Sequence, residues 1–116
     1  MKYKVKIVKL GELCKEFIVE KMVILFDEEA PEELQEISVV HTKGELKEEV
    51  EKGDKIRIGE KEYTVTAVGD EANKTLKELG HCTLKFNGGN EADLPGVINL
   101  DGELGDIKVG EDLIIC

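Results

Sequence analysis

The sequence contains no long apolar stretch. Its densest apolar run, Met22–Phe26, falls far short of the roughly 20 residues that a helix needs to cross a bilayer. The first residues alternate lysine with apolar side chains and lack the apolar block of a signal peptide. We therefore expect a cytoplasmic protein that does not insert directly into a membrane.

Cysteine and proline are also scarce. The three cysteines, Cys14, Cys82 and Cys116, are widely separated and include no CxxC pair. This spacing argues against a disulfide framework or a zinc knuckle and favours reduced, half-buried thiols. With two prolines and 41% apolar residues, the composition is ordinary for a folded chain. At 116 residues it can bury one modest core, so residues 1–116 are predicted to form a single domain.

Basic residues are outnumbered by acidic ones. Lysine and arginine total 16 against 26 aspartate and glutamate, for a formal net charge of −10. Nucleic-acid-binding proteins cluster basic side chains on one face, so this class is disfavoured. An acidic surface suits a basic protein partner, but it also simply keeps a small protein soluble, and both interpretations stay open.

Apolar and polar residues alternate along much of the chain, and this period predicts β-strands. The expected strands are 3–10, 22–26, 37–41, 55–58, 62–68, 81–86, 97–100 and 112–115. Gly59-Glu60 lies between two of them and predicts a hairpin. Residues 87–96 are rich in turn-forming side chains and form a candidate functional loop.

One segment, 70–79, has a clear helical pattern. Asp70 can cap this helix, apolar residues recur inside it at helical spacing, and Gly80 can end it. Shorter helical or looped segments are expected after Pro31 and at 45–50. Many short strands with one good helix predict an all-β fold, a closed or nearly closed antiparallel β-barrel with one short α-helix.

His41 is the first candidate for chemistry. It follows an apolar strand and precedes Thr42, Lys43 and Gly44, so we expect a reachable imidazole beside a hydroxyl, a cation and backbone N–H groups. Gly44 would allow a sharp change of backbone direction. A neutral ring nitrogen can attack phosphorus while such donors stabilise the equatorial oxygens. From the residues alone, a structural or merely solvated histidine is the alternative.

His81 is the only other histidine, and it opens the strand after the helix. It is either a structural strand-end residue or an auxiliary imidazole that contacts a phosphoryl group or orients His41. A metal site built from both histidines and a cysteine lacks the compact ligand spacing of zinc sites. Gly88-Gly89 is not followed by the residues of a P-loop. No metal or cofactor is predicted.

Several blocks, in order, resemble the glucitol/sorbitol-specific IIA component of the bacterial sugar phosphotransferase system. The most specific is VVHTKGELK at 39–47, which resembles the phosphorylation-site region of that family. The other blocks are 22–31, 63–69, 79–86 and 90–96. The resemblance covers nearly the whole chain and is looser before Lys21 and after Leu100.

The resemblance implies a phosphotransferase component that holds a phosphoryl group transiently on His41. Phosphate would pass from phosphoenolpyruvate through enzyme I and HPr to this residue, then to the IIB component and, with IIC, to the incoming sugar. Thr42, Lys43 and Gly44 would stabilise the phosphoryl group. Some members carry a histidine where Lys43 stands, so here a fixed positive charge replaces it. The alternative class is a non-enzymatic small-ligand-binding or regulatory β-barrel module.

Overall fold

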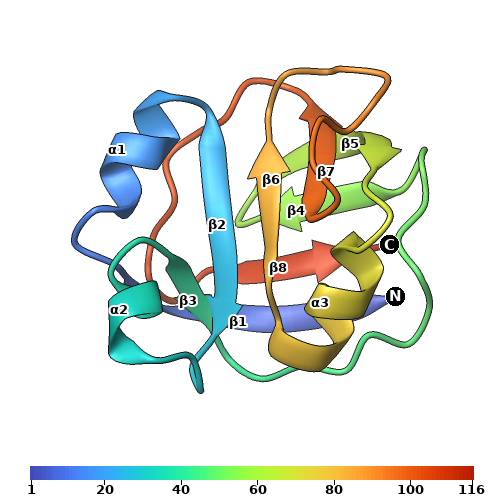
Figure 1. The fold of residues 1–116 in the computed structure, drawn as a ribbon. Coiled ribbons are helices and arrows are strands. Elements are labelled where there is room, and N and C mark those ends of the chain that lie inside the picture. The colour runs from blue at the N-terminus through green and yellow to red at the C-terminus, as the bar shows by residue number, and fades with distance from the viewer.

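The chain folds into a barrel of eight strands with three short helices (Figure 1). The computed structural model describes every residue from 1 to 116. The strands are β1 (Tyr3–Leu10), β2 (Met22–Asp27), β3 (Val39–His41), β4 (Lys55–Ile58), β5 (Lys61–Val68), β6 (Cys82–Lys85), β7 (Val97–Asp101) and β8 (Asp112–Ile115). Around the barrel their order is β1, β3, β2, β6, β7, β5, β4 and β8. The predicted closed all-β barrel is confirmed.

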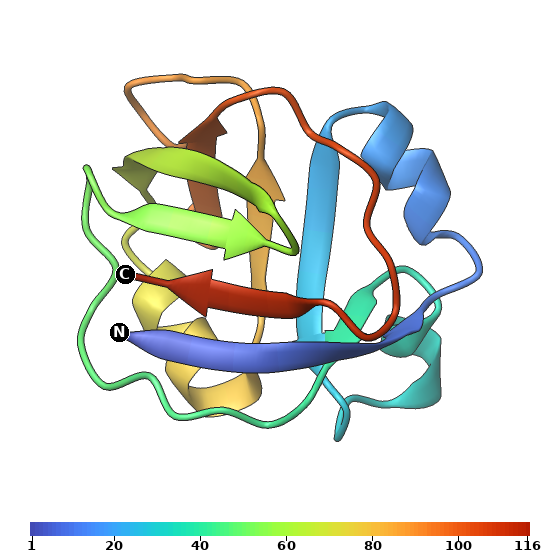
Figure 2. The same cartoon turned by 180° about the vertical axis from the view of Figure 1, so that it is seen from behind.

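The barrel closes where its first and last strands pair. β1 and β8 run antiparallel, with Tyr3 opposite Ile115 and Lys6 opposite Asp112. The N–H of Lys2 continues this ladder by donating to Ile115 O at 2.7 Å. Figure 2 shows the two chain ends next to each other as a result. The predicted hairpin is also present, because β4 and β5 pair antiparallel around Gly59-Glu60.

Six of the eight strand pairings are antiparallel, as in the predicted barrel, and two are parallel, which the prediction did not include. β2 pairs in parallel with β3, and β6 pairs in parallel with β7. A parallel pair requires the chain to return to the starting end before it re-enters the sheet. The segments 28–38 and 86–96 make these returns. They are two of the stretches that the sequence marked as loops or short helices.

The helices are α1 (Cys14–Val19), α2 (Glu32–Gln35) and α3 (Ala72–Leu79). The prediction of one helix is therefore wrong, although α2 lies where a turn or helix was expected after Pro31. α3 begins at Ala72, and its N-cap is Glu71, without a side-chain cap, rather than Asp70. Gly80 ends it with a left-handed φ of 62°. The segment 45–50 forms neither helix nor strand.

Apolar and polar side chains alternate along the strands, and the apolar ones fill the barrel interior. In β1, Tyr3, Val5 and Ile7 point inward, while the lysines between them face solvent. These three belong to a cluster of 21 buried hydrophobic residues that forms the core. Phe26 and Val40 are buried but lie outside that cluster, on the outer face of the wall. None of the helices is long and apolar enough to cross a membrane.

Candidate functional site

His41 ends β3 with its side chain inside the barrel. Its backbone lies between Ile7 of β1 and Asp27 of β2 in the ladder. Because side chains alternate along a strand, His41 faces the same way as the core residue Val39. The residue is 0% exposed. The expectation of a reachable imidazole is therefore wrong for this conformation.

Both ring nitrogens of His41 lie against backbone carbonyls. Nδ1 is 2.7 Å from Thr42 O and Nε2 is 2.8 Å from Gly80 O. Carbonyl oxygens only accept, and a neutral imidazole carries one N–H. Both contacts are thus hydrogen bonds only when the ring is protonated at both nitrogens. In this conformation neither nitrogen offers a lone pair to an incoming group.

Asp27 and Gly80 lie close to this ring, and we call these two residues together with His41 the inner cluster. A Cβ built on Gly80 would lie 2.8 Å from both Asp27 Cβ and His41 Cε1. Asp27 is 6% exposed, and its Oδ1 accepts the N–H of Glu29 at 2.9 Å. Sequence reasoning missed Asp27. The available signal was an acidic residue directly after the apolar run of β2.

Thr42 is held to β1 rather than projecting freely. Its N–H donates to Lys6 O at 2.9 Å, and its Oγ1 accepts the N–H of Lys6 at 3.0 Å. An accepting hydroxyl still has a proton to donate. Thr42 can therefore keep this link and still donate one hydrogen bond outward.

Lys43, which is exposed, and Gly44, which is half-buried, follow Thr42. Lys43 Nζ lies 3.1 and 3.0 Å from the two carboxylate oxygens of Glu29. That hydrogen-bonded pairing raises the pKa of Lys43, so the side chain stays cationic. The backbone N–H groups of both residues make no hydrogen bond to the protein. Two free donors and one cation thus lie next to the strand end.

Gly44 is required for close packing. A Cβ there would lie 2.5 Å from Val5 Cγ1 and 3.2 Å from Tyr3 Cε1. Gly44 does not adopt a positive φ, so the predicted need for a special backbone direction is not what the structure shows. The Tyr3 ring itself meets His41 edge-on, with centroids 6.1 Å apart. Gly44 and His41 therefore share a buried neighbour.

His81 follows the inner cluster directly but lies on the other side of the wall. Its ring stacks on Phe26, with centroids 4.0 Å apart and planes 13° from parallel. Nδ1 is 2.9 Å from Leu25 O. Phe26 faces outward and His41 faces inward, so the two imidazoles occupy opposite faces of the barrel wall. They are linked by the Gly80–His81 backbone, whose Gly80 O contacts His41.

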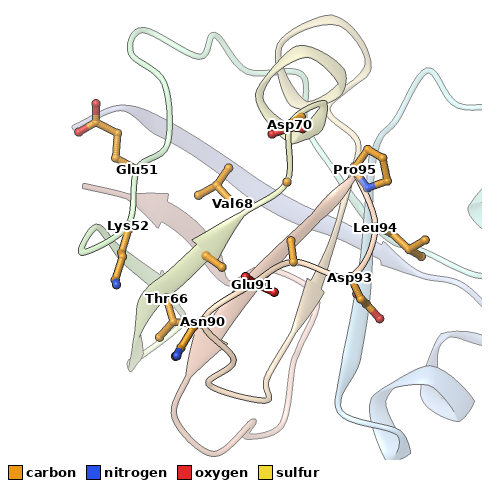
Figure 3. Close-up of a pocket in the computed structure, with 13 residues that line it drawn as sticks. Glu51, Lys52, Thr66, Val68, Asp70, Asn90, Glu91, Asp93, Leu94 and Pro95 are labelled. Carbon is orange, nitrogen blue, oxygen red and sulfur yellow. The ribbon is translucent and has the colours of Figure 1, made fainter.

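The largest groove lies elsewhere, beside the predicted functional loop (Figure 3). It has a volume of about 870 Å³ and is lined by 51–52, 66–70 and 90–95. Neither histidine borders it. Asp93 of this loop pairs with Lys85 of β6 at 2.8 Å, which lowers the pKa of the Asp93 carboxyl. The loop therefore borders a polar surface groove separate from the histidines.

No group of three or more histidine, cysteine, aspartate and glutamate side chains is placed to hold a metal ion. The three cysteines are free, with Cys14 and Cys82 buried and Cys116 exposed. Burial raises the pKa of the Cys82 thiol to about 12. The two buried thiols are therefore protonated core side chains, whereas half-buried ones were expected.

Comparison with known proteins gives one consistent result. The profile of the PTS system glucitol/sorbitol-specific IIA component matches residues 2–114. The PTS system glucitol/sorbitol-specific EIIA components of Shigella flexneri and Escherichia coli (strain K12) are each 39% identical over 104 residues, covering 90% of this chain and 85% of theirs. The crystal structure of a PTS system IIA component from Enterococcus faecalis V583 superimposes with a TM-score of 0.83 at 27% identity, covering 96% of this chain and 97% of that one. The chain therefore belongs to the family of glucitol/sorbitol-specific IIA components of the phosphotransferase system.

Proposed function

We propose that residues 1–116 act in the cytoplasm as a single phosphocarrier domain for glucitol/sorbitol uptake. It takes a phosphoryl group from phospho-HPr and passes it to the IIB component of the permease, whose IIC component moves the sugar. Family membership over residues 2–114 supports this role. The core cluster of 21 residues fills the barrel interior, which does not favour the alternative of a small-ligand-binding barrel.

His41 is the proposed acceptor. The observation that carries this assignment is its position at the end of β3, directly before free N–H groups and the Lys43 cation. Its burial means that acceptance on Nε2 requires the Gly80 O contact to open. Losing one hydrogen bond costs about 1 kcal/mol net. The proposal therefore includes an open form of the inner cluster, as a minor conformation of the kind that proteins populate at roughly 0.1–10%.

The transfer is a direct exchange between two imidazoles. In the open form, the lone pair of neutral His41 Nε2 attacks phosphorus in line. The N–P bond of phosphohistidine on HPr breaks, and its electron pair returns to the HPr ring. The Thr42 hydroxyl proton, the Gly44 N–H and the Lys43 ammonium stabilise the equatorial oxygens, because phosphoryl transfer depends mainly on positioning and electrostatics.

The test uses enzyme I, HPr, IIB and labelled phosphoenolpyruvate. The wild type should take up acid-labile label and deliver it to IIB, whereas His41→Gln should deliver none. The glutamine amide keeps an N–H donor for Gly80 O, and the melting temperature checks that the variant is folded. Delivery by folded His41→Gln at the wild-type rate would remove His41 from the carrier role. A wild type that takes up no label would refute the phosphocarrier function.

A further inference from the structure

The hydrogen bond of His81 fixes which of its nitrogens carries a proton. Nδ1 lies 2.9 Å from Leu25 O, and a carbonyl oxygen can only accept. The proton therefore sits on Nδ1. In the neutral ring, Nε2 then has a lone pair and no hydrogen.

That Nε2 atom has no hydrogen-bond partner and is not sealed in the interior. The only hydrogen bond of the ring is the one through Nδ1. Two side-chain polar atoms, Tyr3 Oη and Asn99 Oδ1, lack a hydrogen-bond partner and are also completely buried. His81 Nε2 lacks a partner too, but it is not one of these completely buried atoms. His81 as a whole is half-buried, because one face of its ring rests on Phe26. The ring is held from one side by Phe26, and Nε2 is not sealed from solvent.

His41 has the opposite properties in the same conformation. Its two nitrogens both contact carbonyls, and the residue is 0% exposed. Of the two imidazoles in the chain, only that of His81 has a ring nitrogen that is neither hydrogen-bonded nor sealed from solvent. Its orientation is already that of a nucleophile, since a backbone carbonyl orients the ring through the far nitrogen.

We propose that His81 Nε2 is a second phosphoryl acceptor, loaded from phospho-HPr while the inner cluster is closed. The inference rests on the proposed phosphocarrier function. The Nε2 lone pair forms the new P–N bond, and the P–N bond of phospho-HPr breaks with its electron pair returning to the HPr ring. The Nδ1 proton stays on His81 and remains hydrogen-bonded to Leu25 O, so no other reactant is needed.

The surroundings of His81 indicate a short-lived adduct. His81 follows Gly80, the C-cap of α3, and the C-terminal end of a helix carries a partial negative charge. This charge favours the cationic ring of the adduct and repels its phosphoryl oxygens. A phosphoryl group on His81 should therefore be short-lived and return to the HPr imidazole by the reverse of the loading step, in which the P–N bond to His81 breaks and its electron pair returns to Nε2.

The experiment combines rapid quenching with mapping of the phosphate. Wild type, His41→Gln, His81→Gln and the double variant are mixed with enzyme I, HPr and labelled phosphoenolpyruvate, quenched at alkaline pH, digested and analysed by mass spectrometry. Because His81 is half-buried and on the outer wall, His81→Gln should fold normally. We expect early label on the wild-type peptide that contains His81, loss of this first phase in His81→Gln, and uptake by folded His41→Gln but not by the double variant.

The outcomes separate this inference from the proposed function. If the wild type is labelled at His41 alone at every time point, and His81→Gln is labelled with wild-type kinetics, the second acceptor is refuted while the phosphocarrier stands. Phosphate on His81 in the wild type supports the inference, whatever the folding of the His41 variant. Absence of label from every protein refutes the phosphocarrier function and the second acceptor together.

Discussion

Gly80 lies directly against the His41 ring: its carbonyl oxygen is 2.8 Å from Nε2, and a Cβ on it would lie 2.8 Å from Cε1. Gly80 also ends α3 with a φ of 62°. The same residue thus stops the helix, closes over the proposed acceptor and begins the turn to His81. Its missing side chain is what allows these three roles at one position.

Gly80→Ala should destabilise the protein strongly. A left-handed φ costs a residue with Cβ about 1–2 kcal/mol, and forcing an extra carbon against His41 and Asp27 adds about 1–3 kcal/mol. The matched control is Gly53→Ala, because Gly53 has a φ of 96° but no atom within 4 Å of its built Cβ. In urea unfolding, Gly53→Ala should lose only the free energy that corresponds to the backbone strain of a left-handed φ. Equal losses in both variants would contradict close packing at the inner cluster.

Gly44→Ala should lose stability through packing alone. The new methyl would meet Val5 Cγ1 at 2.5 Å, and overpacking of a buried site costs about 1–3 kcal/mol. Gly96→Ala is the control, because that position has neither a positive φ nor a neighbour within 4 Å. The control should be neutral or slightly stabilised, since alanine restricts the unfolded chain. A Gly44→Ala variant as stable as the control would contradict the fit of this loop against β1.

Thr42→Val should weaken the link between β1 and the segment after β3. The Lys6 N–H would lose its acceptor at 3.0 Å, which costs about 1 kcal/mol. Thr42→Ser keeps the hydroxyl and should retain most of the stability. The free energy of unfolding in urea, measured for both variants, shows whether the loss of the hydroxyl is what destabilises Thr42→Val. If valine and serine are equally well tolerated, the hydroxyl contact contributes nothing.

The buried Tyr3 hydroxyl should make the protein sensitive to alkali. Its Oη has no partner, and burial, aided by Cys82 and Asp27, raises the pKa of Tyr3 above its ordinary 10.0. The folded state therefore keeps the phenolic proton at pH values where the unfolded chain releases it. This stabilisation is complete below pH 10 and falls as the pH rises, by up to about 1.4 kcal/mol per pH unit.

Tyr3→Phe removes both the unpaired hydroxyl and the titrating proton. At pH 8 the variant should be as stable as the wild type or slightly more stable, because an unsatisfied buried polar group is unfavourable. Between pH 8 and 11 its free energy of unfolding should fall less than that of the wild type. An identical pH dependence for the two proteins would show that Tyr3 ionises as easily when folded as when unfolded.

The barrel itself was predictable because period-two alternation is a local signal. β1 and β8 lie within the expected residues, and the hairpin of β4 and β5 follows from Gly59-Glu60. The parallel pairings were not predictable, since strand direction depends on the path of 28–38 and 86–96 in space. α1 was missed because it is short and buries only Cys14, which leaves little helical periodicity to detect.

The candidate site was predictable in its residues but not in its geometry. The run Val39-Val40-His41 has no polar partner that marks which face is outward, so the sequence did not show that His41 points inward. Gly80 contacts His41 across 39 positions of chain, and no local pattern encodes such a contact. For the same reason, the sequence did not predict the hydrogen bond between the Thr42 hydroxyl and the Lys6 N–H of β1.

The pairing of β1 with β8 determines how the barrel completes itself. Lys6 and Asp112 meet across 106 positions of sequence, so the entropy of closing that loop is paid before any contact at the seam is gained. Until then the chain is an open sheet with unpaired edges at β1 and β8, since β8 is paired with β4 on its other side. Such edges recruit other chains. Slow pairing of β1 with β8 should therefore both limit the rate of folding and leave the chain prone to aggregation.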